Sequence, residues 1–456
     1  MVVTTAPTRT EPSRLLAPGL AATTTGMFAL IAFVAFEAMA VTTVMPTVAA
    51  DLDGVALYAL AFAAPLAGGV VGMVAAGMWS DRRGPVTPLV ASLVLFSLGL
   101  LVCGTAGSME VLVAGRVVQG LGGGALTVGL YVVVGLVFPA ALQPAVFASF
   151  AAAWVLPSLF GPAVAAYVAD AVGWRWVFLG TVGLVAVAAL LITPALRRLG
   201  DRADGEPAPP SRLVWAVVGA VAVLALELFG SGRTSTLLLS AGALVVVVVA
   251  LRRLLPPGTL VARRGLPAVI ATRGLLGATF FCAEAYIVFV LQESYGLSPG
   301  RAGLALTVVG VAWATASQAQ ARLGAGVSHA TAMRWGTGLV LAGVVALMLV
   351  VVTHAHPLLA GASYVLAGAG MGFGYPRTSV AMLDVSSDRD RGFNSAALTI
   401  ADSLGAALAL SLSGVAFAVA VRSDADPFSV VYAIAVGIGV LGVLAARRTT
   451  PPARRT

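Results

Sequence analysis

An arginine lies in the middle of one long apolar run, within the segment GRVVQGLGGG at 115–124. An arginine at mid-membrane depth costs roughly 2.5 kcal/mol or more unless it faces water or a carboxylate. Arg116, Gln119 and Gly120 occupy positions i, i+3 and i+4, so a helix places them on one face. Gly120 and Gly124 would let another helix approach closely. We therefore expect Arg116 to have a partner on a neighbouring helix.

Three acidic residues, Glu37, Glu284 and Asp402, also lie inside apolar runs. Glu37 stands about 20 Å along a helix that rises 1.5 Å per residue, which is near mid-depth in a membrane. A carboxyl group there is costly to keep charged, so it could load and release a proton. Phe280 and Phe281 lie at helical spacing from Glu284. This apolar surface with a single acidic residue suits a hydrophobic cation.

Asp402 continues a polar stripe with Ser395 and Thr399, which we expect to line water. No basic residue lies within a helical turn of Asp402, Glu37 or Glu284, and Arg273 is about 16 Å along the axis from Glu284. Each acid should then be protonated or paired with Arg116. For any one acid a structural hydrogen bond is the alternative, but for the set we expect at least one functional acid.

The composition is that of a membrane protein. The chain has 456 residues, of which 59% are hydrophobic and 10% charged, and its mean hydropathy is +0.99. So few charges cannot cover a soluble core of this size, and the sequence predicts an all-α polytopic membrane protein. Its net charge of +8 lies in short loops without interleaved aromatic residues, so we expect no nucleic acid partner. Cys103 and Cys282 lie in separate apolar runs, which argues against a disulfide and against a metal site.

Apolar runs of about 17 to 30 residues predict about fourteen transmembrane helices. They form two groups of six with a pair between them, as expected of an internally duplicated transporter with an inserted hairpin. Charge alone does not decide whether that pair crosses, but its uninterrupted apolar run at 237–251 favours crossing. The predicted units are a cytoplasmic tail at 1–23, a six-helix bundle at 24–195, a cytoplasmic linker at 196–212, the inserted hairpin at 213–251, a cytoplasmic loop at 252–267, a second six-helix bundle at 268–446 and a cytoplasmic tail at 447–456.

The arginines predict the orientation of these helices. All 27 basic residues are arginine, and short cytoplasmic loops retain positive charge whereas translocated loops do not. With the N-terminus inside, all but six arginines fall in cytoplasmic segments. Two lie within apolar runs, Arg116 and Arg273. Four lie on the outer side of the membrane: Arg175, Arg233, Arg301 and Arg422. Both termini are therefore expected in the cytoplasm.

The segment GMWSDRRGP at 77–85 lies between two apolar runs and carries three charges. These charges cannot sit in hydrocarbon, so we expect a tight turn at the membrane surface. The pattern resembles the G-x-x-x-D-R-x-G-R-R loop of the major facilitator superfamily, with Gly77, Asp81, Arg82 and Gly84 matching. The resemblance implies a conformational gate in which the aspartate caps a neighbouring helix and the arginines clamp the two halves. A simple basic anchor is the alternative.

Other segments are similar to the proton-coupled, 14-span drug antiporter branch of that superfamily. The segment at 115–124 resembles its G-R-x-x-Q-G-x-G motif, which implies a proton-transfer role for Arg116, with a structural tie as the alternative. Glu37, nine residues before Pro46, stands in the position of an aspartate in that branch. Gly161 and Pro162 match its G-P-x-x-G-G signature, although Ala165 and Ala166 replace the closing glycines. Trp174, Arg175, Trp176 and Phe178 match its W-R-W-x-F start.

Physically, Pro162 removes a helix hydrogen bond, so we expect Gly161 and Pro162 to form a hinge against a neighbouring helix.

Two further expectations concern polar residues. Glu227 lies near the outer end of its run and would reach the membrane surface, and His329, His354 and His356 fall in loops and would be solvated.

We interpret the chain as a major facilitator protein and not an enzyme. The expected function is proton-coupled export, by antiport and alternating access, of hydrophobic or amphipathic small molecules such as drugs. A lipid or glycolipid exporter is the first alternative, and a non-transporting membrane receptor or scaffold is the second. Glu37, Arg116 and Asp402 are assigned to proton coupling, and Glu284, Phe280, Phe281 and Gln119 to substrate binding. We expect a monomer in the bacterial cell membrane with no cofactor, driven by the proton gradient because the chain has no Gly-Lys-Ser/Thr phosphate loop for ATP.

The orientation is testable with a single cysteine introduced at Ser211, in the predicted linker. A membrane-impermeant thiol reagent added to intact cells should leave this cysteine unlabelled, because positively charged segments stay in the cytoplasm. Labelling from outside would overturn the predicted orientation.

Overall fold

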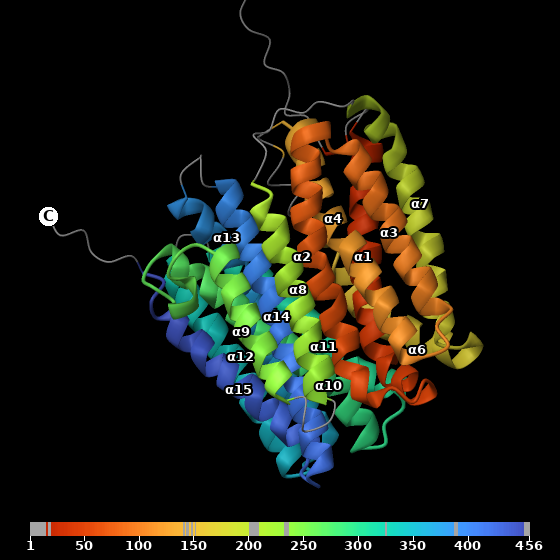
Figure 1. Cartoon of the computed structure of the whole chain (residues 1–456), viewed down its shortest axis with the longest axis vertical. Helices are drawn as coiled ribbons and strands as arrows, with labels where there is room; N and C mark the ends of the chain where they lie inside the picture. The colour runs from red at the N-terminus through yellow and green to blue at the C-terminus, as the bar shows by residue number, and fades with distance from the viewer. Residues whose placement is uncertain are drawn as a thin grey trace, which may run out of the picture.

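The computed structural model describes residues 20–139, 152–199, 209–231, 237–323, 326–386 and 391–450, together with Leu15, Leu16, Leu142, Val146, Ser149 and Phe150. These ranges are helices joined by short turns and loops (Figure 1). Twelve helices in this part of the chain are long and apolar enough to cross a membrane. The predicted all-α membrane protein is confirmed. The tail at 1–23 and the linker at 196–212 lie mostly outside the described residues.

The first half of the chain forms one bundle. Its α4 packs on α2 and α3, while α1 packs on α6 and α7. The described helices of this half are α1 (Ala21–Asp51), α2 (Tyr58–Arg83), α3 (Val86–Gly104), α4 (Met109–Val137), α6 (Val155–Val172) and α7 (Arg175–Leu199).

The second half forms another bundle, in which α10 packs on α14 and α15, and α13 packs on α11 and α12. Its helices are α10 (Leu266–Glu293), α11 (Pro299–Leu323), α12 (His329–Val352), α13 (Pro357–Val385), α14 (Arg391–Arg422) and α15 (Pro427–Ala446). The two bundles meet where α2 contacts α14 and α6 contacts α11. At this junction the hydroxyl of Tyr58 donates to the carbonyl oxygen of Ala285 at 2.6 Å.

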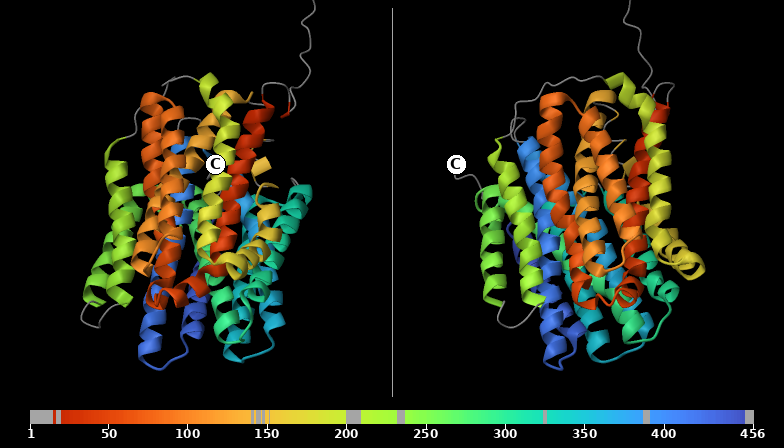
Figure 2. Two further views of the ribbon diagram at one scale, coloured as in Figure 1. Left: turned by 90° about the vertical axis from the view of Figure 1, so that its right-hand side faces the viewer. Right: turned by 45° about the vertical axis from the view of Figure 1, so that its right-hand side comes forward.

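Between the halves in sequence, α8 (Ser211–Ser231) and α9 (Leu237–Leu254) pack against each other at one edge of the molecule (Figure 2). α8 also contacts α2 and α14, one helix from each half. α8 is among the twelve apolar helices of the described chain and α9 is not. The crossing of the membrane by this pair therefore stays a prediction.

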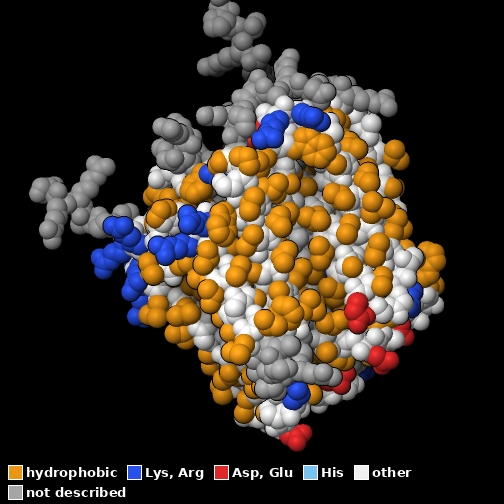
Figure 3. Space-filling model, in the orientation of Figure 1, with side chains coloured by type: hydrophobic (Ala, Val, Ile, Leu, Met, Phe, Trp, Pro, Cys, Tyr) orange, Lys and Arg blue, Asp and Glu red, His pale blue; other side chains and the backbone are white. Residues whose placement is uncertain are grey.

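The surface agrees with a membrane-embedded body. On the face seen in Figure 3, apolar side chains cover the helices, and charged side chains gather toward the two ends and the edges. Many large apolar side chains are exposed, among them Leu190 at 74% and Leu238 at 85%, as expected of helices that face lipid.

Close helix packing in the first bundle depends on glycine. A Cβ atom at Gly120 would clash with the carbonyl oxygen of Pro65, and one at Gly124 would clash with that of Gly69. The predicted close approach at Gly120 and Gly124 is confirmed, with α2 as the partner of α4. Glycine allows this because it has no side chain to keep the backbone of α2 away.

The predicted tight turn at 77–85 is wrong in its extent. α2 continues through Arg83, so Asp81 and Arg82 lie in its last helical turn, and the chain turns only at Gly84 and Pro85. Gly84 adopts a φ of 76°, which favours glycine, and its N–H donates to the Ser80 carbonyl oxygen at 2.9 Å. Arginines in a last turn are favourable because they face the negative end of the helix dipole, which explains why charge did not end the helix.

The glycine contact predicts a selective loss of stability. Gly124→Ala should destabilise the fold by about 1–3 kcal/mol, because the added methyl group pushes α4 away from α2. Gly180→Ala in α7 is the matched control, since a Cβ there meets nothing within 4 Å. Thermal unfolding in detergent should show a lower midpoint for Gly124→Ala alone. Equal midpoints for the two variants would contradict this packing.

Candidate functional site

The first candidate site is a buried ion pair between α1 and α4. Nη1 of Arg116 lies 2.5 Å from Oε1 of Glu37, and both residues are 5% exposed. The same Nη1 donates to Oε1 of Gln119 at 2.7 Å. The structure therefore brings three predicted site residues together, and it supplies the partner that Arg116 was expected to have.

A proline in α2 completes this site. Pro65 has no N–H, so the carbonyl oxygen of Ala61, four residues earlier, lacks its usual donor within the helix. Nε of Arg116 donates to this oxygen at 3.0 Å. The guanidinium thus contacts acceptors on α1, α2 and α4. The sequence carries the signal for this contact, a proline inside an apolar helix, although Pro65 was not among the predicted site residues.

The second candidate site lies in the other half and corrects the prediction for Asp402. Asp402 pairs with Arg273 of α10 and not with Arg116, since its Oδ2 lies 3.3 Å from Nε of Arg273. The hydroxyl of Tyr375, on α13, also donates to this Oδ2. The guanidinium carbon of Arg273 lies 3.2 Å from the centroid of the Tyr375 ring. Arg273 and Tyr375 were not predicted as site residues, because spacing along one helix does not show which residues of other helices lie beside it.

Glu284 is buried about one helical turn after a cluster of aromatic side chains. It is 6% exposed, and no ion pair or hydrogen bond of its side chain occurs within the described part of the chain. One turn earlier, the ring of Phe280 stacks on Tyr364 at 5.3 Å between centroids and meets Trp313 edge-on at 5.3 Å. Phe281 packs edge-on against Phe280 at 5.5 Å. Tyr364 and Trp313 come from α13 and α11, so the sequence alone did not place them here.

Gly161 and Pro162 lie where helices of the two halves meet. A Cβ atom at Gly161 would stand 3.3 Å from Cβ of Met39 in α1. Pro162 packs against Gly303 of α11: a Cβ atom added at Gly303 would lie 3.1 Å from Cβ of Pro162. One residue thus packs within its own half and the next packs across the junction, which is a suitable place for the hinge that we predicted.

The predicted gate residues make fewer interhelical contacts than the ion-paired residues do. Asp81 is half-buried and Arg82 is exposed, and within the described ranges neither side chain forms an ion pair or a hydrogen bond. The cap and clamp that the resemblance implied are not formed here by described residues. Gly77 packs loosely on α4, since a Cβ would lie 3.9 Å from Cγ1 of Val128.

Two expectations about polar residues are wrong. Glu227 does not reach the membrane surface: it is 0% exposed and accepts a hydrogen bond from Ser411 of α14. His329 is not simply solvated, because its Nε2 lies 2.9 Å from Oδ2 of Asp384 and its Nδ1 lies 3.3 Å from Nη1 of Arg377. Position in the sequence gives the depth of a residue but not the helix face that it occupies. His354 is exposed, and His356 accepts from the N–H of Leu358 at the start of α13.

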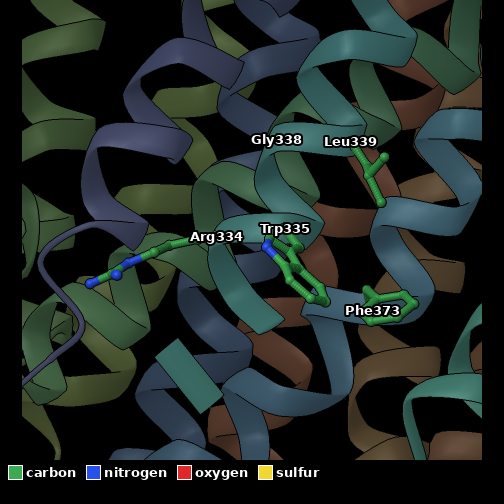
Figure 4. Close-up of a pocket in the computed structure, with 5 residues that line it drawn as sticks. All are labelled: Arg334, Trp335, Gly338, Leu339 and Phe373. Atoms are coloured by element: carbon green, nitrogen blue, oxygen red, sulfur yellow. The ribbon is translucent and has the colours of Figure 1, made fainter. Parts of the chain in front are cut away.

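A separate groove of about 380 Å³ lies on the outside of the second bundle, between α12 and α13 (Figure 4). Arg334, Trp335, Gly338, Leu339 and Phe373 line it. Its surface is apolar and open, and none of the predicted site residues lines it.

Comparison with known proteins agrees with this architecture. The family model of the Major Facilitator Superfamily matches residues 27–360. A protein of Mycobacterium tuberculosis described as a probable multidrug-efflux transporter is 27% identical over 436 residues, 90% of each chain. A multidrug efflux pump of Staphylococcus aureus is 24% identical over 84% of this chain and 87% of its own.

Solved structures show the same fold at low identity. A transporter of the POT family in complex with 5-aminolevulinic acid has a TM-score of 0.70 at 13% identity, covering 93% of this chain and 94% of its own. A D-xylose-proton symporter has a TM-score of 0.67 at 17% identity, covering 94% and 98%. With two helical bundles, buried charges between helices and a family match over most of its length, this chain belongs to the Major Facilitator Superfamily.

Proposed function

We propose that this protein exports hydrophobic or amphipathic small molecules across the cell membrane in exchange for protons, by alternating access. The drug-efflux names of its relatives support the substrate class. The observation that carries the coupling is the Glu37 and Arg116 pair, because buried charges at membrane depth are costly and characteristic of proton and substrate pathways. Both termini lie in the cytoplasm in this proposal, and the monomer is the transporting unit.

The coupling step follows from the partners of Arg116. A proton on Glu37 removes the charge attraction to Arg116, while the hydrogen bonds to Gln119 and Ala61 still hold the guanidinium. Removing one partner of a buried pair otherwise destabilises a protein by about 3–5 kcal/mol. One proton therefore loosens α1 from α4, while Arg116 keeps its hydrogen bonds to Gln119 and Ala61. The bundle changes its packing only in the protonated state.

The substrate site in this proposal is the aromatic environment of Glu284. Aromatic faces and one carboxylate together favour a cation with apolar bulk, since rings attract cations and bury apolar surface. Phe280 and Phe281 supply two of these rings. Glu284 supplies a carboxyl group that has no cation of its own within the described residues and that would become charged when a cationic substrate binds beside it. Gln119 would contribute a hydrogen bond from the opposite half.

Asp402 is the second proton-coupling residue in the proposal. Its pairing with Arg273 and Tyr375 gives the second half an ion pair of the same kind as that of Glu37 and Arg116. The gate residues Gly77, Asp81, Arg82 and Gly84 lie at the end of α2 and would act on the rate of switching between states.

Substitution of Glu37 tests the proposal. In proteoliposomes with an imposed pH gradient, Glu37→Gln should lower dye export at least about tenfold, because glutamine mimics the protonated carboxyl but cannot release a proton. Equilibrium binding of the same dye should persist, because the variant keeps the substrate site at Glu284. Glu110→Gln, at an exposed acid of α4, is the matched control and should transport normally.

The same assay can also contradict the proposal. If Glu37→Gln, Glu284→Gln and Asp402→Asn each transported dye with an unchanged response to pH, proton exchange through these residues would be untenable. Transport of lipids but not of dyes, in the same vesicles, would replace the drug substrate with a lipid.

A further inference from the structure

The groove between α12 and α13 has no part in the proposed transport cycle, yet it has the features of a ligand site. Its volume of about 380 Å³ falls in the range of roughly 300–1,000 Å³ that small-ligand sites occupy. The rings of Trp335 and Phe373 lie 6.1 Å apart between centroids. Leu339 stands one turn further along α12 (Figure 4). The groove therefore offers aromatic and aliphatic surface on the outside of the bundle, where Trp335 is 52% exposed.

The groove runs from the charged end of α12 into its apolar part. Arg334 and Leu339 lie about 8 Å and about 15 Å along the axis from the start of this helix at His329. Between them, a Cβ atom at Gly338 would meet nothing within 4 Å, so no described side chain fills the space there. A ligand lying in the groove would thus meet charge at one end and apolar side chains at the other.

Five arginines gather at the charged end. Nη2 of Arg334 donates to the carbonyl oxygen of Arg447 at 3.5 Å and to the hydroxyl of Thr450 at 3.0 Å. The N–H of Gly265 donates to the carbonyl oxygen of Arg448 at 3.1 Å, which brings the loop before α10 to the end of α15. The resulting basic cluster consists of exposed side chains: Arg263, Arg264, Arg334, Arg447 and Arg448.

The basic cluster is not neutralised by described residues. No ion pair of its arginines occurs in the part of the chain that the structure describes. The segments 252–267, 322–334 and 447–456 contain no acidic residue, and Asp384, near this end of α13, lies 2.9 Å from Nε2 of His329. In Figure 3, basic side chains gather without acidic ones at the edge where Figure 1 draws α9, α12 and α15. Positive charges held together in this way repel one another, so a bound anion would stabilise this end of the bundle.

We propose that the groove binds an anionic phospholipid, with its headgroup at the basic cluster and an acyl chain between Trp335 and Phe373. Arginine suits the headgroup because its guanidinium can donate two parallel hydrogen bonds to a phosphate. Basic clusters at the membrane surface attract anionic lipids, and the aromatic and aliphatic side chains give the chain an apolar surface.

The charges also separate this lipid from other occupants. A cationic amphipathic drug, the substrate in the proposed function, would be repelled by the basic cluster, so the groove is a site apart from that of Glu284. A second copy of this chain docked by the same surface would bring two basic clusters together, which repel each other. An anionic phospholipid matches the groove in both charge and polarity.

The test is the quenching of Trp335 fluorescence by phospholipids brominated in their acyl chains, in phosphatidylcholine nanodiscs with one protein each and no substrate. The contribution of Trp335 is the difference between the parent protein and Trp335→Phe. At equal fractions, brominated phosphatidylglycerol should quench this contribution more than brominated phosphatidylcholine, because only phosphatidylglycerol carries a net negative charge. The preference should fall as the salt concentration rises, since salt screens the attraction.

Two pairs of variants locate the lipid. Arg334→Gln should lower the preference for phosphatidylglycerol about fivefold, whereas Arg301→Gln, at the exposed start of α11 on the opposite end of the bundle, should not. Gly338→Leu should fill the groove and remove the preference. Gly361→Leu in α13, where a Cβ atom also meets nothing within 4 Å, should keep it.

Three results would overturn the site. They are equal quenching by the two lipids in the parent protein, a preference that survives Gly338→Leu, and a preference that neither salt nor Arg334→Gln lowers. Weaker quenching by both lipids in nanodiscs that hold two copies than in those that hold one would assign the groove to a second copy instead. Since neither substrate nor a gradient is present, failure here is distinct from failure of drug export.

Discussion

A charge inside this apolar helical protein must find its partner on a different helix, and the arrangement of the helices follows from that constraint. Arg116 of α4 is neutralised by Glu37 of α1, and Arg273 of α10 by Asp402 of α14. Each pair lies within one half of the molecule and fastens two of its helices. In a low-dielectric interior such a pair is strong only while both members are charged, so a proton on the acid is enough to loosen it. In the proposed mechanism, stability and switching therefore depend on the same atoms.

Prolines and glycines make these contacts possible. Pro65 frees the carbonyl oxygen of Ala61, which Arg116 uses, and Pro376 likewise frees the carbonyl oxygen of Gly372, to which Ser317 of α11 donates at 3.3 Å. In both halves a side chain from a neighbouring helix occupies the gap left in the backbone ladder. Close approach at Gly120 and Gly124 brings α4 near enough for the first of these contacts. The irregular positions in the helices are therefore the positions of interhelical contact.

The sequence predicted the elements well, and it predicted contacts between them only where a residue had few alternatives. Arg116 needed an acid, Glu37 lay at a matching depth, and the structure joins them. Asp402 was expected to be protonated or to use Arg116, because residue spacing describes one helix at a time and Arg273 belongs to another. Glu227 was placed at the surface because depth along a helix was known and its face was not. The turn near Asp81 was predicted too long, since arginine is compatible with the last turn of a helix.

Proton coupling at the Glu37 and Arg116 pair is tested most directly by the release of protons when a cationic amphipathic dye binds the purified protein in weakly buffered nanodiscs. We predict that dye binding releases protons from the parent protein and from Glu110→Gln, but releases markedly fewer from Glu37→Gln, whose glutamine has no proton to exchange. Dye binding without proton release in the parent, or equal release from Glu37→Gln, would contradict a coupling role for this pair.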